Sequence, residues 1–225
     1  MNPDLVDIVD PPKPASQVLP EWYKQASPYI NEDDKHLPIT KGFQYGINRT
    51  YKRCSPVMDA MTQGYVWTTS CDIQFVLNDP AQRVVWGNHP YQPLDYTHSR
   101  EQLPNYPLEG EPFRWILPFK PVTPKGYSML FKHPSHRWDL PWITLEGVVD
   151  TDKHPVGTNA PAILDPTFEG VIPKGTPVVQ MIPFKRESWK SMSEADGIMD
   201  INNAKFTSKI EKVYTKNYRQ KKEFK

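Results

Sequence analysis

Two carboxylates, Asp150 and Asp152, stand at the end of the apolar stretch 145–149 and just before a loop rich in Pro, Gly and Asn. Carboxylates at this spacing can do acid–base chemistry, in which one of them accepts a proton from an attacking water molecule. The same residues also fit a polar strand end, where they cap a turn or pair with Arg53 and Arg137. The residue types leave both interpretations open, and we favour the structural one.

Polar residues of both signs elsewhere in the chain complete a candidate pocket. Grouped around a β core, such side chains can bind a phosphorylated or zwitterionic ligand. Beside Asp150 and Asp152 as catalytic candidates, the predicted ligand-binding residues are Lys52, Arg53, Asp59, Arg137, Gln180 and Arg186. The sequence identifies no cofactor, and it leaves open whether the protein is an enzyme.

His133 and His136 have the HxxH spacing of some metal sites, with Asp139 nearby. Metal ligands must converge on one point, and Pro134 disfavours the helix that would align the two rings. We therefore predict a solvent-facing or hydrogen-bonding turn here and no metal site. Glycine-rich phosphate loops of the GxGxxG and GxxxxGK[ST] types do not occur in the sequence.

The charge balance argues against several classes of partner. The 27 basic and 26 acidic residues give a net charge of +1, so no global field favours nucleic acid or an anionic membrane. The N-terminus lacks the basic and apolar regions of a signal peptide, and no stretch approaches the ~18 apolar residues of a membrane span. We therefore expect a soluble protein, with Cys54 and Cys71 as buried thiols in a reducing compartment.

Proline is the strongest compositional signal, with 25 prolines against 11 glycines and none beyond Pro183. Because proline lacks an N–H group and fixes φ, it disfavours long helices and central strands. We expect a mainly β fold with a short helix after Pro20, another over 56–63 that ends at Gly64, and a C-terminal helix from about residue 203. The predicted parts are a Pro-rich N-terminal arm with a short helix (1–40), a β-rich core (41–190) and a basic helical tail (191–225).

Hydrophobic patterning places several strands in the core. The β-branched and aromatic segment 65–77 predicts one bulged strand or a pair of strands. We expect a strand over 141–150 that is broken at Gly147, and two short strands on either side of Lys174–Gly175. Residues 88–112 are expected to form a long loop.

Segments between residues 122 and 186 follow one another in a characteristic order: "TPKGYSMLF" (123–131), "HPSHR" (133–137), "GVVDTD" (147–152) and "GTPVVQM" (175–181), and "TQGYVWTTSCDIQF" (62–75) is a looser match earlier in the chain. This order resembles the β-clip fold of the dUTPase and dCTP deaminase superfamily. The resemblance implies a β-clip-like barrel of short strands over about 113–186. It also implies that Asp150 orients and activates the water that attacks an α-phosphorus.

The chain departs from that family at several functional positions. Val66 stands in place of the first motif's Asp, and Lys153 in place of the Tyr that stacks below the deoxyribose. The arginine–serine motif is replaced by "HPSHR", where Arg137 and Ser135 are the nearest substitutes. The resemblance therefore supports the fold more than it supports nucleotide hydrolysis.

A further set of segments spans the whole chain: "LPEWYK", "KRCSPVMDAMTQGY", "TPKGYSMLF", "GVVDTD" and "IPKGTPVVQMIPFKRESWK". This set is similar to a family of uncharacterised proteins of tailed phages and some bacteria. The resemblance implies a structural or interaction protein of a virus or an infected bacterial cell, located in the cytoplasm or the virion. Its expected partners are further copies of itself or another viral or host protein. The alternative is a small-ligand or nucleotide-binding β-clip protein with dUTPase-like hydrolase activity.

Overall fold

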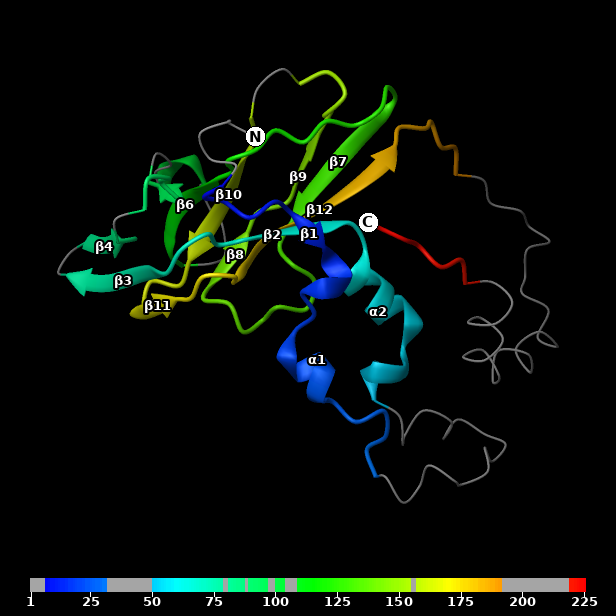
Figure 1. Ribbon diagram of the computed structural model, residues 1–225, viewed down its shortest axis with the longest axis horizontal. Helices are drawn as coiled ribbons and strands as arrows, with labels where there is room; N and C mark the ends of the chain where they lie inside the picture. The colour runs from blue at the N-terminus through cyan, green and yellow to red at the C-terminus, as the bar shows by residue number, and fades with distance from the viewer. Residues whose placement is uncertain are drawn as a thin grey trace. The chain divides into compact units, whose positions relative to one another are not determined.

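The computed structural model describes residues 7–31, 50–78, 81–87, 89–96, 100–103, 109–154, 157–191 and 219–225 (Figure 1). The chain forms two compact units. The first unit comprises the described residues within Met1–Val18 and Gln63–Arg186, together with Phe224. The second unit comprises the described residues within Leu19–Thr62 and Glu187–Glu223, together with Lys225.

Over its described residues the first unit has twelve strands in three antiparallel sheets. The five-stranded sheet has the order β1 (Lys13–Pro14), β2 (Tyr65–Thr68), β12 (Pro177–Lys185), β7 (Tyr127–Lys132) and β9 (Gly147–Val149). The four-stranded sheet has the order β5 (Leu94–Asp95), β6 (Glu111–Ile116), β10 (Asn159–Leu164) and β8 (Trp142–Thr144). The three-stranded sheet has the order β11 (Gly170–Ile172), β3 (Ile73–Asn78) and β4 (Ala81–Val85). The prediction of a mainly β protein is confirmed, and within these described strands no sheet closes into a barrel.

Aromatic side chains form much of the core of the first unit. Phe113 and Trp115 alternate with more exposed residues along β6, so both rings lie on the buried face of the sheet. The ring centroids of Phe113 and Trp115 are 5.1 Å apart, and those of Trp115 and Trp142 are also 5.1 Å apart. Large rings in edge-to-face contact bury much area per residue, which explains how such short strands sustain a core.

Three prolines lie inside strands that have neighbours on both sides, against the expectation that proline avoids central strands. Pro183 pairs with β7 but lies beyond the end of the β2 pairing. Pro161 pairs with β6 but precedes the residues that pair with β8. Pro112 pairs with β10 but lies outside the β5 pairing. Each proline therefore occupies a position with one paired neighbour, where a missing N–H is tolerated as on an edge strand.

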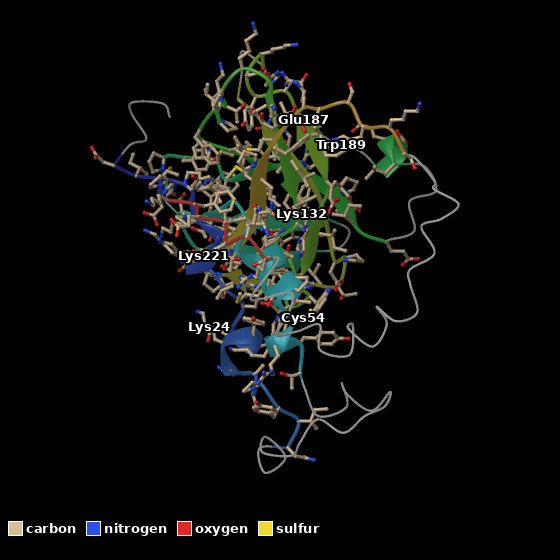
Figure 2. All side chains as sticks on the ribbon, turned by 90° about the vertical axis from the view of Figure 1, so that its right-hand side faces the viewer. Lys24, Cys54, Lys132, Glu187, Trp189 and Lys221 are labelled. Carbon is tan, nitrogen blue, oxygen red and sulfur yellow. The ribbon has the colours of Figure 1, made fainter. Side chains whose placement is uncertain are left out.

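The second unit contains the short helices. Helix α1 (Glu21–Gln25) begins after Pro20, and α2 (Ser55–Thr62) follows the 3-10 turn η5 (Tyr51–Arg53), so both helix predictions are confirmed. Figure 2 labels Lys24 on α1 and Cys54 just before α2, and the two helices lie side by side in both figures. Over the described residues, no helix has the length and apolar character needed to cross a bilayer.

Several expected elements differ in detail. The segment over 141–150 divides into β8 and β9, which belong to different sheets, and so do β11 and β12 around the Lys174–Gly175 turn. Strand β10 lies in the Pro- and Asn-containing stretch where we expected a loop, and the long loop over 88–112 contains β5 and the 3-10 turn η6 (Arg100–Gln102). These differences share a cause, because the sheet in which a strand pairs is decided by contacts distant in sequence.

The predicted terminal parts are only partly visible. The Pro-rich arm contributes β1, in which Lys13 is paired with Val66 of β2, so it is partly a strand. The predicted C-terminal helix lies mostly outside the described residues, and 219–225 contain no helix.

Gly64 fixes a close approach of two backbone segments. It follows α2 with a φ of +74°, and a Cβ atom added there would lie 2.0 Å from the carbonyl oxygen of Met181. Gly126 has a similar φ of +89° but has open space around the Cβ position. Substitutions at the two glycines can therefore distinguish the cost of a positive φ, which both positions share, from the cost of a steric clash, which only Gly64 would have.

We expect Gly64→Ala to destabilise the protein more than Gly126→Ala. The positive φ costs about 1–2 kcal/mol in either variant, and overpacking adds about 1–3 kcal/mol at Gly64. Urea denaturation followed by tryptophan fluorescence measures the decrease in the free energy of unfolding for each variant. Equal losses in the two variants would show that the chain relieves the clash without cost.

Candidate functional site

Both candidate carboxylates meet one arginine at the end of a central strand. Asp150 and Asp152 lie in the turn that follows β9, and Arg186 directly follows β12. The Arg186 guanidinium lies 3.0 Å from an Asp150 oxygen and 2.5 Å from an Asp152 oxygen. The sequence thus identified three residues that the fold brings together, although we had expected Arg53 and Arg137 as the partners in the structural interpretation.

Both side-chain oxygens of Asp152 accept hydrogen bonds in this cluster. The two terminal nitrogens of Arg186 donate to its two oxygens at 2.8 and 2.5 Å, and the Gly126 N–H donates to one of them at 2.8 Å. Its side chain is only 3% exposed. The Arg186 guanidinium and the Gly126 N–H hold the pKa of Asp152 far below its usual range.

Asp150 is more open but also bonded. The Ser128 hydroxyl on β7 donates to it at 2.6 Å, and this bond, with Arg186 nearby, lowers the pKa of Asp150. Half of its side-chain surface remains exposed. Arg186 also donates to the Tyr127 carbonyl at 3.0 Å and to the Ser128 hydroxyl at 3.1 Å, so one guanidinium joins the ends of β7 and β12 and the turn after β9.

This geometry suits a structural role better than acid–base chemistry. An efficient general base has a pKa near the working pH, whereas both carboxylates are held ionised far below it. A phosphate-binding arginine needs an open fork, whereas the fork of Arg186 is occupied by Asp152. The structural interpretation of Asp150 and Asp152 therefore accounts for the contacts observed.

Two other predicted ligand-binding residues of the first unit have separate structural contacts. Gln180 on β12 is almost completely buried; its side-chain oxygen accepts from the Ser135 N–H at 3.0 Å, and its nitrogen donates to the Gln63 carbonyl at 2.7 Å. Arg137 forms a bidentate ion pair with Asp139 in its own turn, at 2.8 and 2.7 Å. Neither contact includes Asp150 or Asp152.

The turn over 133–139 is held by hydrogen bonds from a histidine ring. The Thr144 N–H donates to Nδ1 of His133 at 3.2 Å, which leaves the proton on Nε2 to donate to the Arg137 carbonyl at 3.0 Å. Burial lowers the pKa of His133, consistent with a neutral ring. The predicted hydrogen-bonding turn is therefore present at His133. Over the described residues, no group of three His, Cys, Asp or Glu side chains is placed to hold a metal ion.

The remaining candidates, Lys52, Arg53 and Asp59, lie in the second unit and hold its segments together. The ammonium of Lys52 donates to the Tyr23 carbonyl and, at 3.0 Å, to the Lys24 carbonyl. The Arg53 side chain donates to the Tyr29 hydroxyl at 2.5 Å. These contacts tie the η5 turn to α1 and the segment that follows it.

Asp59 binds the C-terminal segment. Arg219 donates to it at 2.6 Å, and Lys222 lies 3.3 Å from its other oxygen. The hydrogen bond from Arg219 lowers the pKa of Asp59. Part of the basic tail is therefore matched to a carboxylate of its own chain.

Sequence reasoning missed the neighbours that complete the carboxylate cluster. Ser128 is a small polar residue next to the apolar run of β7, and this is the one sequence signal that could have indicated its role. The Gly126 N–H carries no sequence signal for its role, since a backbone donor is present at almost every residue. Cys54 and Cys71 are both half-buried free thiols rather than fully buried ones.

We expect Asp152→Asn to lower the melting temperature at pH 7, and to lower it more than Asp150→Asn does, because Asp152 is the more buried partner of Arg186. A carboxyl whose folded pKa lies below its unfolded value of 3.8 contributes stability that is complete above that value. That contribution is lost as the pH falls through the folded pKa. The difference in melting temperature between wild type and Asp152→Asn should therefore be constant from about pH 5 to 7 and shrink below about pH 4. A difference that grows on acidification would contradict the ion-pair account.

We expect Asp59→Asn to release the C-terminal segment, because it removes the charge that Arg219 and Lys222 share. Tryptic release of the peptide 220–225, followed by mass spectrometry, should be about five-fold faster, the factor that corresponds to about 1 kcal/mol. Asp165→Asn in the first unit serves as the matched control and should leave this rate unchanged. An unchanged rate in Asp59→Asn would mean that the ion pair does not restrain the segment.

The comparisons with known proteins provide no relative on which to base a function. No family model matches the chain, and searches of the curated proteins and of the solved structures returned no match. The resemblances to the β-clip fold and to a phage family therefore stay predictions.

Proposed function

We propose that this chain is a structural protein that assembles with copies of itself, and that Asp150 and Asp152 serve the assembly by holding an edge strand in place. The single observation that carries the proposal is strand β9. It is the last strand of the five-stranded sheet, and over the described residues it pairs with β7 alone. An unpaired strand edge is a template for pairing with another chain.

The side chains of β9 leave this edge open to a partner. Val148 is 60% exposed on a strand that contains neither proline nor lysine. The opposite edge of the same sheet, β1, has two residues and ends at Pro14. On the four-stranded sheet, the Thr144 N–H of edge strand β8 is already donated to His133. Edges blunted in these ways are poor templates, so β9 is the best suited of the three.

The Asp–Arg cluster rigidifies the end of this edge. Asp150 directly follows β9, and its contacts with Ser128 and Arg186 hold the strand end against β7 and β12. A pre-ordered edge loses less conformational entropy on association than a mobile one. Antiparallel pairing of two β9 strands about a two-fold axis would join two five-stranded sheets and bury both copies of Val148.

The alternative function, nucleotide hydrolysis by a β-clip enzyme, has less support from the contacts. It requires Asp150 as a base and a free arginine for phosphate, and both groups are engaged within the chain. The β-clip topology over 113–186 and membership of a phage particle remain parts of our proposal that rest on the motif resemblances.

We expect the full chain to be an oligomer at tens of micromolar in size-exclusion chromatography with light scattering, and Val148→Lys to shift it toward the monomer. A lysine on an edge strand disfavours pairing with a like-charged copy. Ile143→Lys is the matched control, since Ile143 is an exposed apolar residue on edge strand β8. A monomeric wild type would refute self-assembly, and an oligomer that survives Val148→Lys would place the interface elsewhere.

A further inference from the structure

A histidine ring links the end of β7 to the edge strand of another sheet. His133 directly follows β7, whose last residue is Lys132 (Figure 2), and Nδ1 of its ring accepts from the Thr144 N–H of β8 at 3.2 Å. Strand β7 belongs to the five-stranded sheet, whereas β8 is the last strand of the four-stranded sheet and pairs with β10 alone among the described strands. The ring therefore holds the turn over 133–139 against that edge.

The Thr144 N–H points away from the rest of its sheet. The next N–H along the chain, that of Leu145, donates to the Pro161 carbonyl of β10 at 2.7 Å. Successive N–H groups in an antiparallel ladder point to opposite sides of the strand, so the Thr144 N–H lies on the open edge of β8. The Thr144 hydroxyl donates to the Val178 carbonyl at 2.8 Å. The strand thus keeps anchors of its own, and His133 satisfies the donor at its edge.

The two bonding partners define the protonation state of the ring. An N–H group can only donate and a carbonyl oxygen can only accept. Nδ1 of His133 therefore directs a lone pair at the Thr144 N–H, and Nε2 carries the proton that it donates to the Arg137 carbonyl at 3.0 Å. A second proton would have to be added to Nδ1, where it would face the Thr144 N–H. Two donors form no hydrogen bond, so the charged ring is incompatible with this contact.

The surroundings of the ring favour its neutral form. Burial lowers the pKa of His133 from its ordinary value of 6.5, and the charges of Lys132 and Arg137 also lower it. The bond to the Arg137 carbonyl and the Asp139 carboxylate act in the opposite direction, but that carboxylate is already paired with the Arg137 guanidinium. The Lys132 ammonium donates to the His133 carbonyl at 3.0 Å, so a positive charge stays beside the ring.

The elements packed against the turn add no other charge to the ring. Strand β8 contributes a tryptophan, an isoleucine and a threonine, and Glu146 beyond it acts on Lys132. On the side of β12, the Ser135 N–H donates to the uncharged side chain of Gln180 at 3.0 Å. His136 has a φ of +60°, a conformation that costs free energy for a residue with a Cβ atom. A turn with this cost depends on its anchors, and the bond to Thr144 is the anchor that one proton removes.

We propose that His133 is a pH-sensitive latch: protonation of its ring on acidification releases the Thr144 N–H and frees the turn over 133–139 from the edge of β8. The proton comes from solvent and is added to Nδ1, and the hydrogen bond to Thr144 is lost. The edge of β8 then presents an unpaired donor, the feature through which an edge strand pairs with a further strand. The proposal concerns the four-stranded sheet and does not depend on self-assembly through β9.

The direction of the pH effect follows from the lowered pKa of the bound ring. A ring in the released turn takes up its proton near pH 6.5, whereas the bound ring takes it up only at a lower pH. The contribution of the latch is therefore complete above about pH 6.5 and is lost as the pH falls toward the pKa of the bound ring. Over that interval one proton favours release by up to about ten-fold per pH unit.

Amide hydrogen exchange of the full chain, measured residue by residue by NMR, tests the latch. After correction for the intrinsic exchange rate, the protection of the Thr144 N–H should fall several-fold between about pH 7 and pH 5. The Leu145 N–H, which is bonded to β10, is the internal control and should keep its protection. Asp152 does not titrate in this interval, because its pKa is held far below it.

His133→Asn supplies the matched variant, since an amide oxygen can accept from the Thr144 N–H but takes up no proton in this range. Its Thr144 protection should not change with pH. His136→Asn, in the same turn, should retain the pH dependence of the wild type, because asparagine tolerates the positive φ.

Three results would overturn the proposal. The first is a Thr144 protection that does not change with pH in the wild type, and the second is an equal loss at Leu145. These two comparisons use the wild-type chain and decide the proposal even where a variant fails to fold. The third is a pH dependence that persists in His133→Asn or disappears in His136→Asn.

Discussion

The guanidinium of Arg186 joins three strands that are distant in sequence. Arg186 directly follows β12, the strand that pairs with both β2 and β7. Its guanidinium binds the turn after β9 through Asp150 and Asp152. Replacing either carboxylate leaves a partly buried arginine with fewer acceptors, which is costly because a desolvated charge needs its partners. The edge of the largest sheet is therefore positioned by charge pairing as well as by the backbone ladder.

This use of the carboxylates limits what chemistry the site can do. Residue types that are reactive in an open cleft become structural once each donor and acceptor has a partner within the chain. Asp152 accepts hydrogen bonds from both terminal nitrogens of Arg186 and from the Gly126 N–H. Asp150 accepts a hydrogen bond from the Ser128 hydroxyl. The self-assembly that we propose requires an ordered β9 edge, and these contacts hold the end of that strand in place.

The sequence predicted local features well and long-range pairing poorly. The starts of α1 and α2 follow from Pro20 and from Ser55 with Pro56, and β2 and β3 follow from the β-branched and aromatic segment 65–77. The partner of Asp152 did not follow, because Arg186 is brought near only when β12 pairs with β7. Strand β10 was missed since its pattern is interrupted by Pro161, which is tolerated only because the β8 ladder begins one residue later.

The placement of proline explains why this chain forms three small sheets and leaves usable edges. Pro112, Pro161 and Pro183 each lie at a strand position that is paired in register on one side only, because proline has no N–H to donate to a second ladder. Short ladders end in exposed edges and faces, some of which are blunted, as at Pro14 of β1. Strand β9 contains no proline, and the outer face of the three-stranded sheet is hollowed rather than covered by described residues. Strand β9 is thus the sheet edge on which our proposal of a partner chain rests.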